Sequence, residues 1–203
     1  MLKIIKDKDP IFFTDEYDVV LLGTSTACSL ASGFQGKLAR KYPYVDAEND
    51  KQPYRDNRRL GTRLTLKEEG KPIISLMYVS KYNDSRNVTI DYEALTNCLS
   101  TANAEFKGKK VITTIVGSTK VDGNGEREKC LEILEKCTKD LDIDVYDYEQ
   151  LTYSEEVAKV IRPLSDKWIK EKIRTTKKQR IEERQKLLKE NYLNKVNYGG
   201  ETY

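Results

Sequence analysis

The segment DVVLLGTSTACSLASGFQGKLARKYP, residues 18–43, is the most informative part of the chain. Its first five residues form a nearly continuous apolar run, which is typical of a strand covered on both faces. Small residues rich in Ser, Thr, Ala and Gly then favour a loop or a helix start. Residues 36–42 predict a short helix that Pro43 ends. Strand, small-residue loop and helix is the order in which phosphate-binding turns are built.

Strands and helices continue to alternate downstream. After a polar stretch over residues 44–59, which predicts an irregular surface excursion, the expected elements are a hairpin of strands 62–66 and 73–79, a helix over 91–106, a strand over 110–116, a helix over 126–141 and a closing strand over 143–148. A second glycine-bearing loop, residues 117–125, directly follows a strand. This order favours an α/β fold with a largely parallel or mixed sheet and helices on both faces. Its ligands would bind at the carboxyl ends of the strands.

The composition excludes several kinds of site. Histidine is absent, and the four cysteines, Cys28, Cys98, Cys130 and Cys137, include no CxxC pair, so we expect buried thiols, no metal and no cofactor. Without histidine, acid/base chemistry would fall to carboxylates, Lys, Tyr or water. The mean hydropathy is -0.69. Because we see neither a secretory signal nor an apolar run near the roughly 20 residues that span a bilayer, we expect a cytoplasmic protein of a cell or host cell and no membrane partner.

The end of the chain differs in charge from the rest. Residues 162–203 carry 12 Lys and Arg against 6 acidic residues, a net charge of +6, whereas the remainder carries -3. We expect residues 1–150 to form one domain and residues 151–203 a basic, helical extension with a disordered end. Such an extension could bind nucleic acid or a protein partner. The alternative is a solvated helix docked through Trp168.

Taken in order, these segments resemble a macro domain over about three quarters of the chain. Residues 18–43 resemble the family segment DAIVNxxNxxGxxGxGIAxxFKKKYP, and residues 59–76 resemble the LGTxxxxxxxGxxIINL hairpin. Shorter matches are residues 91–95 with YxxLxxxL, 115–125 with PxxGxGxxG and 145–149 with VxLYE. The resemblance implies a three-layer α/β/α macro-like domain with a mixed central sheet, plus the C-terminal basic helical extension. It also implies ADP-ribose or a related nucleotide as the ligand.

The two glycine-bearing loops supply most of the candidate ligand-binding residues. A diphosphate needs backbone N–H groups at close range, which favours small side chains in two facing loops. The candidates are Ser25, Gly33 and Phe34 in the first loop and Gly117, Ser118, Gly123, Asn124 and Gly125 in the second. The alternative is that the loops are ordinary turns, because Asp-Gly and Asn-Gly are common turn signals.

Two further candidates follow from the resemblance and concern the adenine. Asp9 lies near the family's GDI aspartate, which accepts a hydrogen bond from the adenine amino group, and Tyr148 lies where an aromatic ring could stack on the base. A surface-turn aspartate and a half-buried strand tyrosine are the respective alternatives.

The candidate catalytic residues are Lys81 and Asp122. The hairpin resembles the branch that includes ADP-ribosyl hydrolases and ADP-ribose 1''-phosphate phosphatases, in which a lysine and an aspartate occupy similar places. A lysine can attack an anomeric carbon, and a carboxylate can activate water. Both residues could equally be ordinary surface residues.

Three functions therefore stay open. The first is an enzyme that hydrolyses an ADP-ribose derivative, either a phosphatase or an ADP-ribosyl hydrolase. The second is a binding module without chemistry, favoured by Ser25 where most family members carry asparagine. The third is a nucleic-acid or assembly protein that uses the basic extension.

Overall fold

The computed structural model describes residues 1–147 except 7, 29, 31–32, 82–88 and 120–122. The predicted extension, residues 151–203, therefore lies outside the described residues, as do Tyr148 and Asp122. The described strands are β1 Leu2–Lys6, β2 Val19–Ser25, β3 Arg63–Leu66, β4 Ile73–Ser80, β5 Lys110–Thr114 and β6 Asp142–Asp147. The described α-helices are α1 Gly33–Lys41, α2 Pro43–Asp50, α3 Tyr92–Glu105 and α4 Arg127–Cys137.

These strands form one mixed sheet in the order β1-β6-β5-β2-β4-β3. Neighbouring strands run parallel, except that β3 is antiparallel to β4, with Arg63 opposite Met77. The mixed sheet and its hairpin confirm the prediction. The parallel strands place their carboxyl ends along one edge, and β2 lies between β5 and β4.

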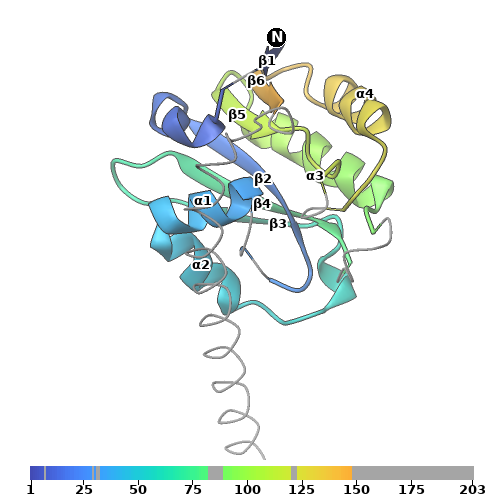
Figure 1. Cartoon of the computed structure of the whole chain (residues 1–203). Helices are drawn as coiled ribbons and strands as arrows, with labels where there is room; N and C mark the ends of the chain where they lie inside the picture. Colours follow the sequence, from blue (N-terminus) through green and yellow to red (C-terminus); the bar gives the residue numbers. More distant parts are fainter. Residues whose placement is uncertain (7, 29, 31–32, 82–88, 120–122, 148–203) are drawn as a thin grey trace, which may run out of the picture. The chain divides into compact units, whose positions relative to one another are not determined.

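Strand β2 is buried on both faces and separates two apolar cores. Val19 and Leu21 pack in the core beneath α3 and α4, whereas Val20 and Leu22 pack in the core beneath α1 and α2. Figure 1 shows the two helix pairs on opposite sides of the sheet. The alternation follows from the two-residue period of a strand, and the resulting three-layer α/β/α architecture is the one expected.

Helix boundaries follow local chemistry. The Asp91 side chain accepts a hydrogen bond of 2.9 Å from the N–H of Ala94 and caps α3. The helix itself is the one that the apolar spacing over residues 91–106 predicts. Pro43 ends α1 but also begins α2. The expected irregular path over residues 44–59 was therefore wrong for residues 44–50, because proline fits the first turn of a helix, where its missing N–H has no intrahelical partner.

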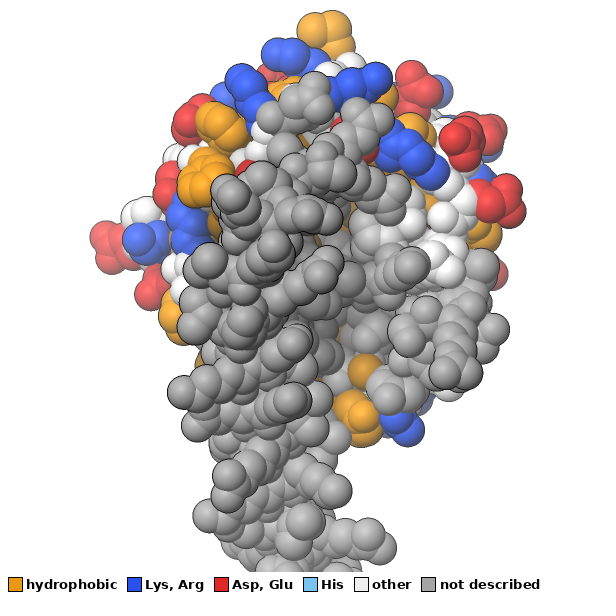
Figure 2. Space-filling model, in the orientation of Figure 1, with side chains coloured by type: hydrophobic (Ala, Val, Ile, Leu, Met, Phe, Trp, Pro, Cys, Tyr) orange, Lys and Arg blue, Asp and Glu red, His pale blue; other side chains and the backbone are white. Residues whose placement is uncertain are grey.

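The surface of the described domain carries both signs of charge. Figure 2 shows Lys and Arg side chains interspersed with Asp and Glu around the visible part of the domain. Within the described residues, every helix is too short or too polar to cross a membrane.

Candidate functional site

The carboxyl ends of neighbouring strands define the candidate site. Ser25 ends β2, Ser80 ends β4 and Thr114 ends β5, and all three side chains are buried. The two glycine-bearing loops follow β2 and β5, which pair directly. The sequence-based expectation that both loops lie at one edge of the sheet is therefore confirmed.

The first loop begins with a tight turn. The Ser25 carbonyl accepts a hydrogen bond of 3.1 Å from the N–H of Cys28, and Ser25 Oγ accepts one of 3.3 Å from the N–H of Ala27. Farther along, Gly33 opens α1 with a φ of 58°, a conformation that glycine adopts without strain. Phe34, predicted as a ligand contact, packs in the core beneath α1 and α2. The structure thus brings Ser25 and Gly33 to the site edge and gives Phe34 a packing role.

Three hydroxyl groups beside this loop are buried without partners. Thr24 Oγ1, Thr26 Oγ1 and Ser80 Oγ make no hydrogen bond to any described residue. The Thr26 N–H donates to the Ser80 carbonyl at 3.0 Å, which joins the ends of β2 and β4. Buried polar groups in native proteins are nearly always hydrogen-bonded, so these hydroxyls indicate a place for water or a ligand.

The second loop is closed by its own backbone. The N–H of Gly125 donates to the Gly117 carbonyl at 2.7 Å, and the N–H groups of Gly123 and Asn124 donate to the Thr119 carbonyl. A Cβ at Gly117, Gly123 or Gly125 would lie 2.5–2.8 Å from atoms of Ile90. The three glycines are thus explained by close packing against one isoleucine.

The predicted phosphate contacts of this loop concern Gly117, Ser118, Gly123, Asn124 and Gly125. The structure places all five together after β5, and Ser118 Oγ donates to the Ile115 carbonyl at 2.7 Å. Several of the polar groups already serve the loop itself. Phosphate contact stays a prediction for these residues.

Asp9 links the start of the chain to α1. One carboxylate oxygen accepts a hydrogen bond of 3.2 Å from the N–H of Ile11 and caps the 3-10 helix η1 (Pro10–Phe12). The other forms an ion pair with Lys37. Asp9 is therefore held in a fixed position, and its proposed contact with adenine stays a prediction.

The structure describes one of the two candidate catalytic residues, Lys81. Lys81 is exposed directly after β4, and its N–H donates to the Thr89 carbonyl at 3.3 Å. It lies at the same edge of the sheet as the first loop. Asp122 lies outside the described residues, so the structure does not bring the two together.

A buried polar group that the sequence did not single out lies beneath the same edge. Arg59, at the end of the 3-10 helix η3 (Asn57–Arg59), stacks on the Tyr78 ring at 3.6 Å from its centroid. The Tyr78 hydroxyl donates to Asn49 Oδ1 at 2.8 Å. The sequence gave no sign that Arg59 is buried, because it follows Arg58 in the polar stretch 44–59, which has no regular spacing of apolar residues.

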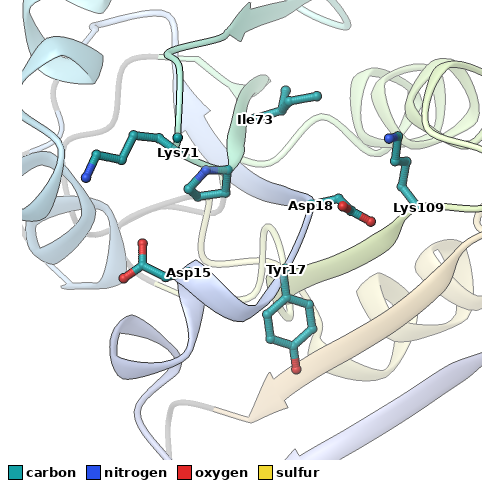
Figure 3. Close-up of a pocket in the computed structure, with 8 residues that line it drawn as sticks. Asp15, Tyr17, Asp18, Lys71, Ile73 and Lys109 are labelled. Atoms are coloured by element: carbon teal, nitrogen blue, oxygen red, sulfur yellow. The ribbon is translucent and has the colours of Figure 1, made fainter.

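A depression of about 490 Å³ opens at the opposite edge of the sheet (Figure 3). Its lining comprises Asp15, Tyr17, Asp18, Gly70, Lys71, Pro72, Ile73 and Lys109. Asp18 precedes β2 and Ile73 begins β4, so this depression lies at the amino ends of the strands. It is separate from both glycine-bearing loops.

Comparison with known proteins identifies the fold. No family model matches the sequence, and no curated protein matches it. Similar solved structures include a Bacteroides thetaiotaomicron protein of unknown function (TM-score 0.57, 17% identity, 72% of this chain and 98% of that chain). Thermosipho africanus DarTG in complex with ADP-ribose matches with a TM-score of 0.59 and 13% identity, over 75% of this chain and 43% of that chain. The Thermus aquaticus DarG macrodomain matches with a TM-score of 0.55 and 10% identity, over 72% of this chain and 98% of that chain. The chain has the macro domain fold.

Proposed function

We propose that this domain binds ADP-ribose or a related nucleotide at the carboxyl edge of its sheet. The observation that carries the proposal is the set of buried, unpartnered hydroxyls of Thr24, Thr26 and Ser80 at adjacent strand ends among the described residues. They lie beside a small-residue loop that leads into a helix, an arrangement suited to hydroxylated, anionic ligands. The similarity in fold to Thermosipho africanus DarTG, whose structure holds ADP-ribose, supports this ligand class.

The residues around the edge suggest how such a ligand would be held. The N-terminus of α1 at Gly33 would face the diphosphate, since helix N-termini favour anions. An ionised carboxylate has about four lone-pair sites. Asp9, which caps η1 and pairs with Lys37, would accept a hydrogen bond from the adenine amino group.

We further propose that the domain hydrolyses an ADP-ribose derivative, as an ADP-ribose 1''-phosphate phosphatase or an ADP-ribosyl hydrolase. Lys81, directly after β4, would act as the amine or as a phosphate contact, and Asp122 would act on water. The position of Lys81 beside the first loop supports its part in this proposal.

The second candidate is a binding module that performs no chemistry. Ser25 favours it, because its side chain is buried and its Oγ accepts the N–H of Ala27, so the hydroxyl serves the turn. A third role, contact with nucleic acid or a protein, rests on the +6 charge of residues 162–203.

Titration calorimetry of the full chain with ADP-ribose tests the binding proposal. We expect saturable binding at one site. AMP and ribose 5-phosphate serve as controls that each carry part of the ligand. Absence of binding heat at several temperatures would overturn the proposal, whereas binding without turnover of ADP-ribose 1''-phosphate or an ADP-ribosylated protein would favour the binding module.

A further inference from the structure

Arg59 is a buried cation with an incomplete set of partners. Its side chain stacks on Tyr78, and the residue is 8% exposed. Nη1 lies 2.7 Å from Cys28 Sγ and 3.3 Å from the Pro53 carbonyl oxygen. Nη2 is buried and has no hydrogen-bond partner among the described residues.

The charge of Arg59 needs an anion nearby. Guanidinium stays protonated in proteins, and burial of a charge is costly unless an opposite charge compensates it. Among the described residues, no carboxylate lies within ion-pair distance of Arg59. Asp56, close in sequence, binds Arg58 through both carboxylate oxygens, at 2.7 to 3.0 Å, and acts on Arg59 only through its charge, from beyond ion-pair distance.

The atom in contact with Arg59 that can carry a negative charge is the sulfur of Cys28. Arg59 Nη1 lies within hydrogen-bond distance of this sulfur, and a charged donor favours the ionised form of its acceptor. Three carbonyl oxygens lie farther from the sulfur, those of Thr26 at 3.5 Å and of Gln52 and Pro53 at 3.8 Å. Of these four contacts, the one with the guanidinium is the shortest.

We propose that Cys28 is held as a thiolate by Arg59 and is the site at which small electrophiles modify this domain. The thiolate sulfur attacks the electrophilic atom, a bond from sulfur to that atom forms, and the bond to the leaving group breaks with the leaving group taking the electron pair. With iodoacetamide, a sulfur–carbon bond replaces the carbon–iodine bond and iodide leaves. No proton is released, because the sulfur is already ionised.

Modification would affect the first loop. The thioether product is neutral, so it removes the anion beside Arg59, and it adds atoms between Ser25 and Gly33. This segment borders the proposed nucleotide site. The state of Cys28 can be tested whether or not ADP-ribose binds.

The other cysteines provide controls within the same chain. Cys98 packs in the core beneath α3, where burial raises its pKa to about 12. Cys137 lies at the end of α4 and is more exposed than Cys28. Reactivity of cysteines follows the thiolate fraction as well as access, so a buried Cys28 that reacts faster than Cys137 would do so because of ionisation.

Groups near Cys28 do not titrate in the useful pH range. Hydrogen bonds from Arg58 lower the pKa of Asp56 to about 2, so it stays ionised. Burial raises the pKa of Tyr78 above its ordinary value, so it stays neutral. Arginine side chains in general stay protonated throughout this range. A pH profile of Cys28 reactivity below about pH 9 therefore reports the thiol itself.

The test is limited alkylation of the folded full chain with iodoacetamide, with each cysteine quantified by peptide mass spectrometry. We expect Cys28 to react at least tenfold faster than Cys98 and Cys137 at about pH 6, where an ordinary thiol of pKa about 8.5 is only about 0.3% ionised. Its rate should change little up to about pH 8. A tenfold rise per pH unit, as for an ordinary thiol, or absence of alkylation would overturn the proposal.

Substitution of Arg59 separates charge from packing. Arg59→Met keeps a long apolar side chain over Tyr78 but removes the cation, so the rate of Cys28 alkylation at about pH 6 should fall at least tenfold. Arg59→Lys should restore part of it. A second measurement is the ultraviolet absorbance of the thiolate, taken as the difference between the wild type and Cys28→Ser. It reports the ionisation of Cys28 directly, so it needs neither access of a reagent to the sulfur nor folding of the Arg59 variants. No difference at about pH 6 would overturn the proposal.

Discussion

Gly117 lies so close to Ile90 that a Cβ on the glycine would be 2.5 Å from Ile90 Cδ1. Gly117 also has a φ of 86°, which other residues adopt only with strain. The second loop therefore needs glycine here for both backbone conformation and space.

Gly117→Ala should destabilise the domain by about 2 kcal/mol or more, from backbone strain and overpacking together. Gly108→Ala is the matched control, because Gly108 has a φ of 73° and open space around its Cα. Urea unfolding should show that the free energy of unfolding falls less in Gly108→Ala than in Gly117→Ala. Ile90→Val, which removes Cδ1, should reduce the difference between the two; equal losses at both glycines would contradict the packing argument.

Gly33→Glu should abolish ADP-ribose binding, because a carboxylate at the start of α1 would fill and repel a diphosphate. Gly70→Glu is its control: Gly33 and Gly70 are both exposed, with φ values of 58° and 71°, but Gly70 lines the depression at the amino ends of the strands. Calorimetry should detect binding in the Gly70 variant alone. Unchanged affinity in a folded Gly33→Glu protein would remove the pocket assignment.

Deletion of residues 163–203 should leave a folded domain with its nucleotide affinity, since the extension lacks a continuous apolar face. Thermal unfolding and calorimetry of the shortened chain check this. Aggregation or early melting would show that the extension is structural.

Asp122→Ala should lower turnover of ADP-ribose 1''-phosphate or an ADP-ribosylated substrate by about 10²-fold or more, as loss of a general acid or base does. ADP-ribose affinity should stay within about a factor of ten. Asp142→Ala, at the amino end of β6, is a control that should keep full activity. An active Asp122→Ala enzyme would exclude this residue from catalysis.

Alkaline pH should destabilise the domain through Tyr42. Burial, followed by the hydrogen bond to Asp15, raises the pKa of Tyr42 to about 12, so the folded state favours the neutral phenol. The resulting stability is fully present below an unfolded pKa of about 10 and is lost as the pH rises toward about 12. Between these pH values, the free energy of unfolding should fall less steeply with pH for Tyr42→Phe than for the exposed control Tyr54→Phe. Parallel curves would contradict the assignment.

The elements that the sequence predicted correctly are those with strong local signals. Strand β2 is an uninterrupted apolar run, and α3 joins a capping residue, Asp91, to apolar residues at helical spacing. Strand β1 had no such signal. It lies at the sheet edge with exposed positions and exists through its pairing with β6, where Leu2 is opposite Ile143.

The candidate site was predictable only in part, for the same reason. Its location followed from two glycine-bearing loops after apolar strands. The packing of Gly117, Gly123 and Gly125 on Ile90 could not be predicted from the sequence, because it depends on a residue from another segment. The ion pair between Asp9 and Lys37 could not be predicted either, because it joins residues 28 positions apart.

Local patterns of apolar and small residues were enough to establish the α/β class and the position of the two loops, and the composition alone excluded histidine chemistry in this sequence. Each of these depends only on neighbouring residues or on residue counts. The cysteines show the limit of such patterns. Nothing around Cys28 or Arg59 in the chain distinguishes either from ordinary residues, and the sequence indicated four similar buried thiols. Their contact, across 31 positions, arises because folding removes both from water and places the cation against the sulfur.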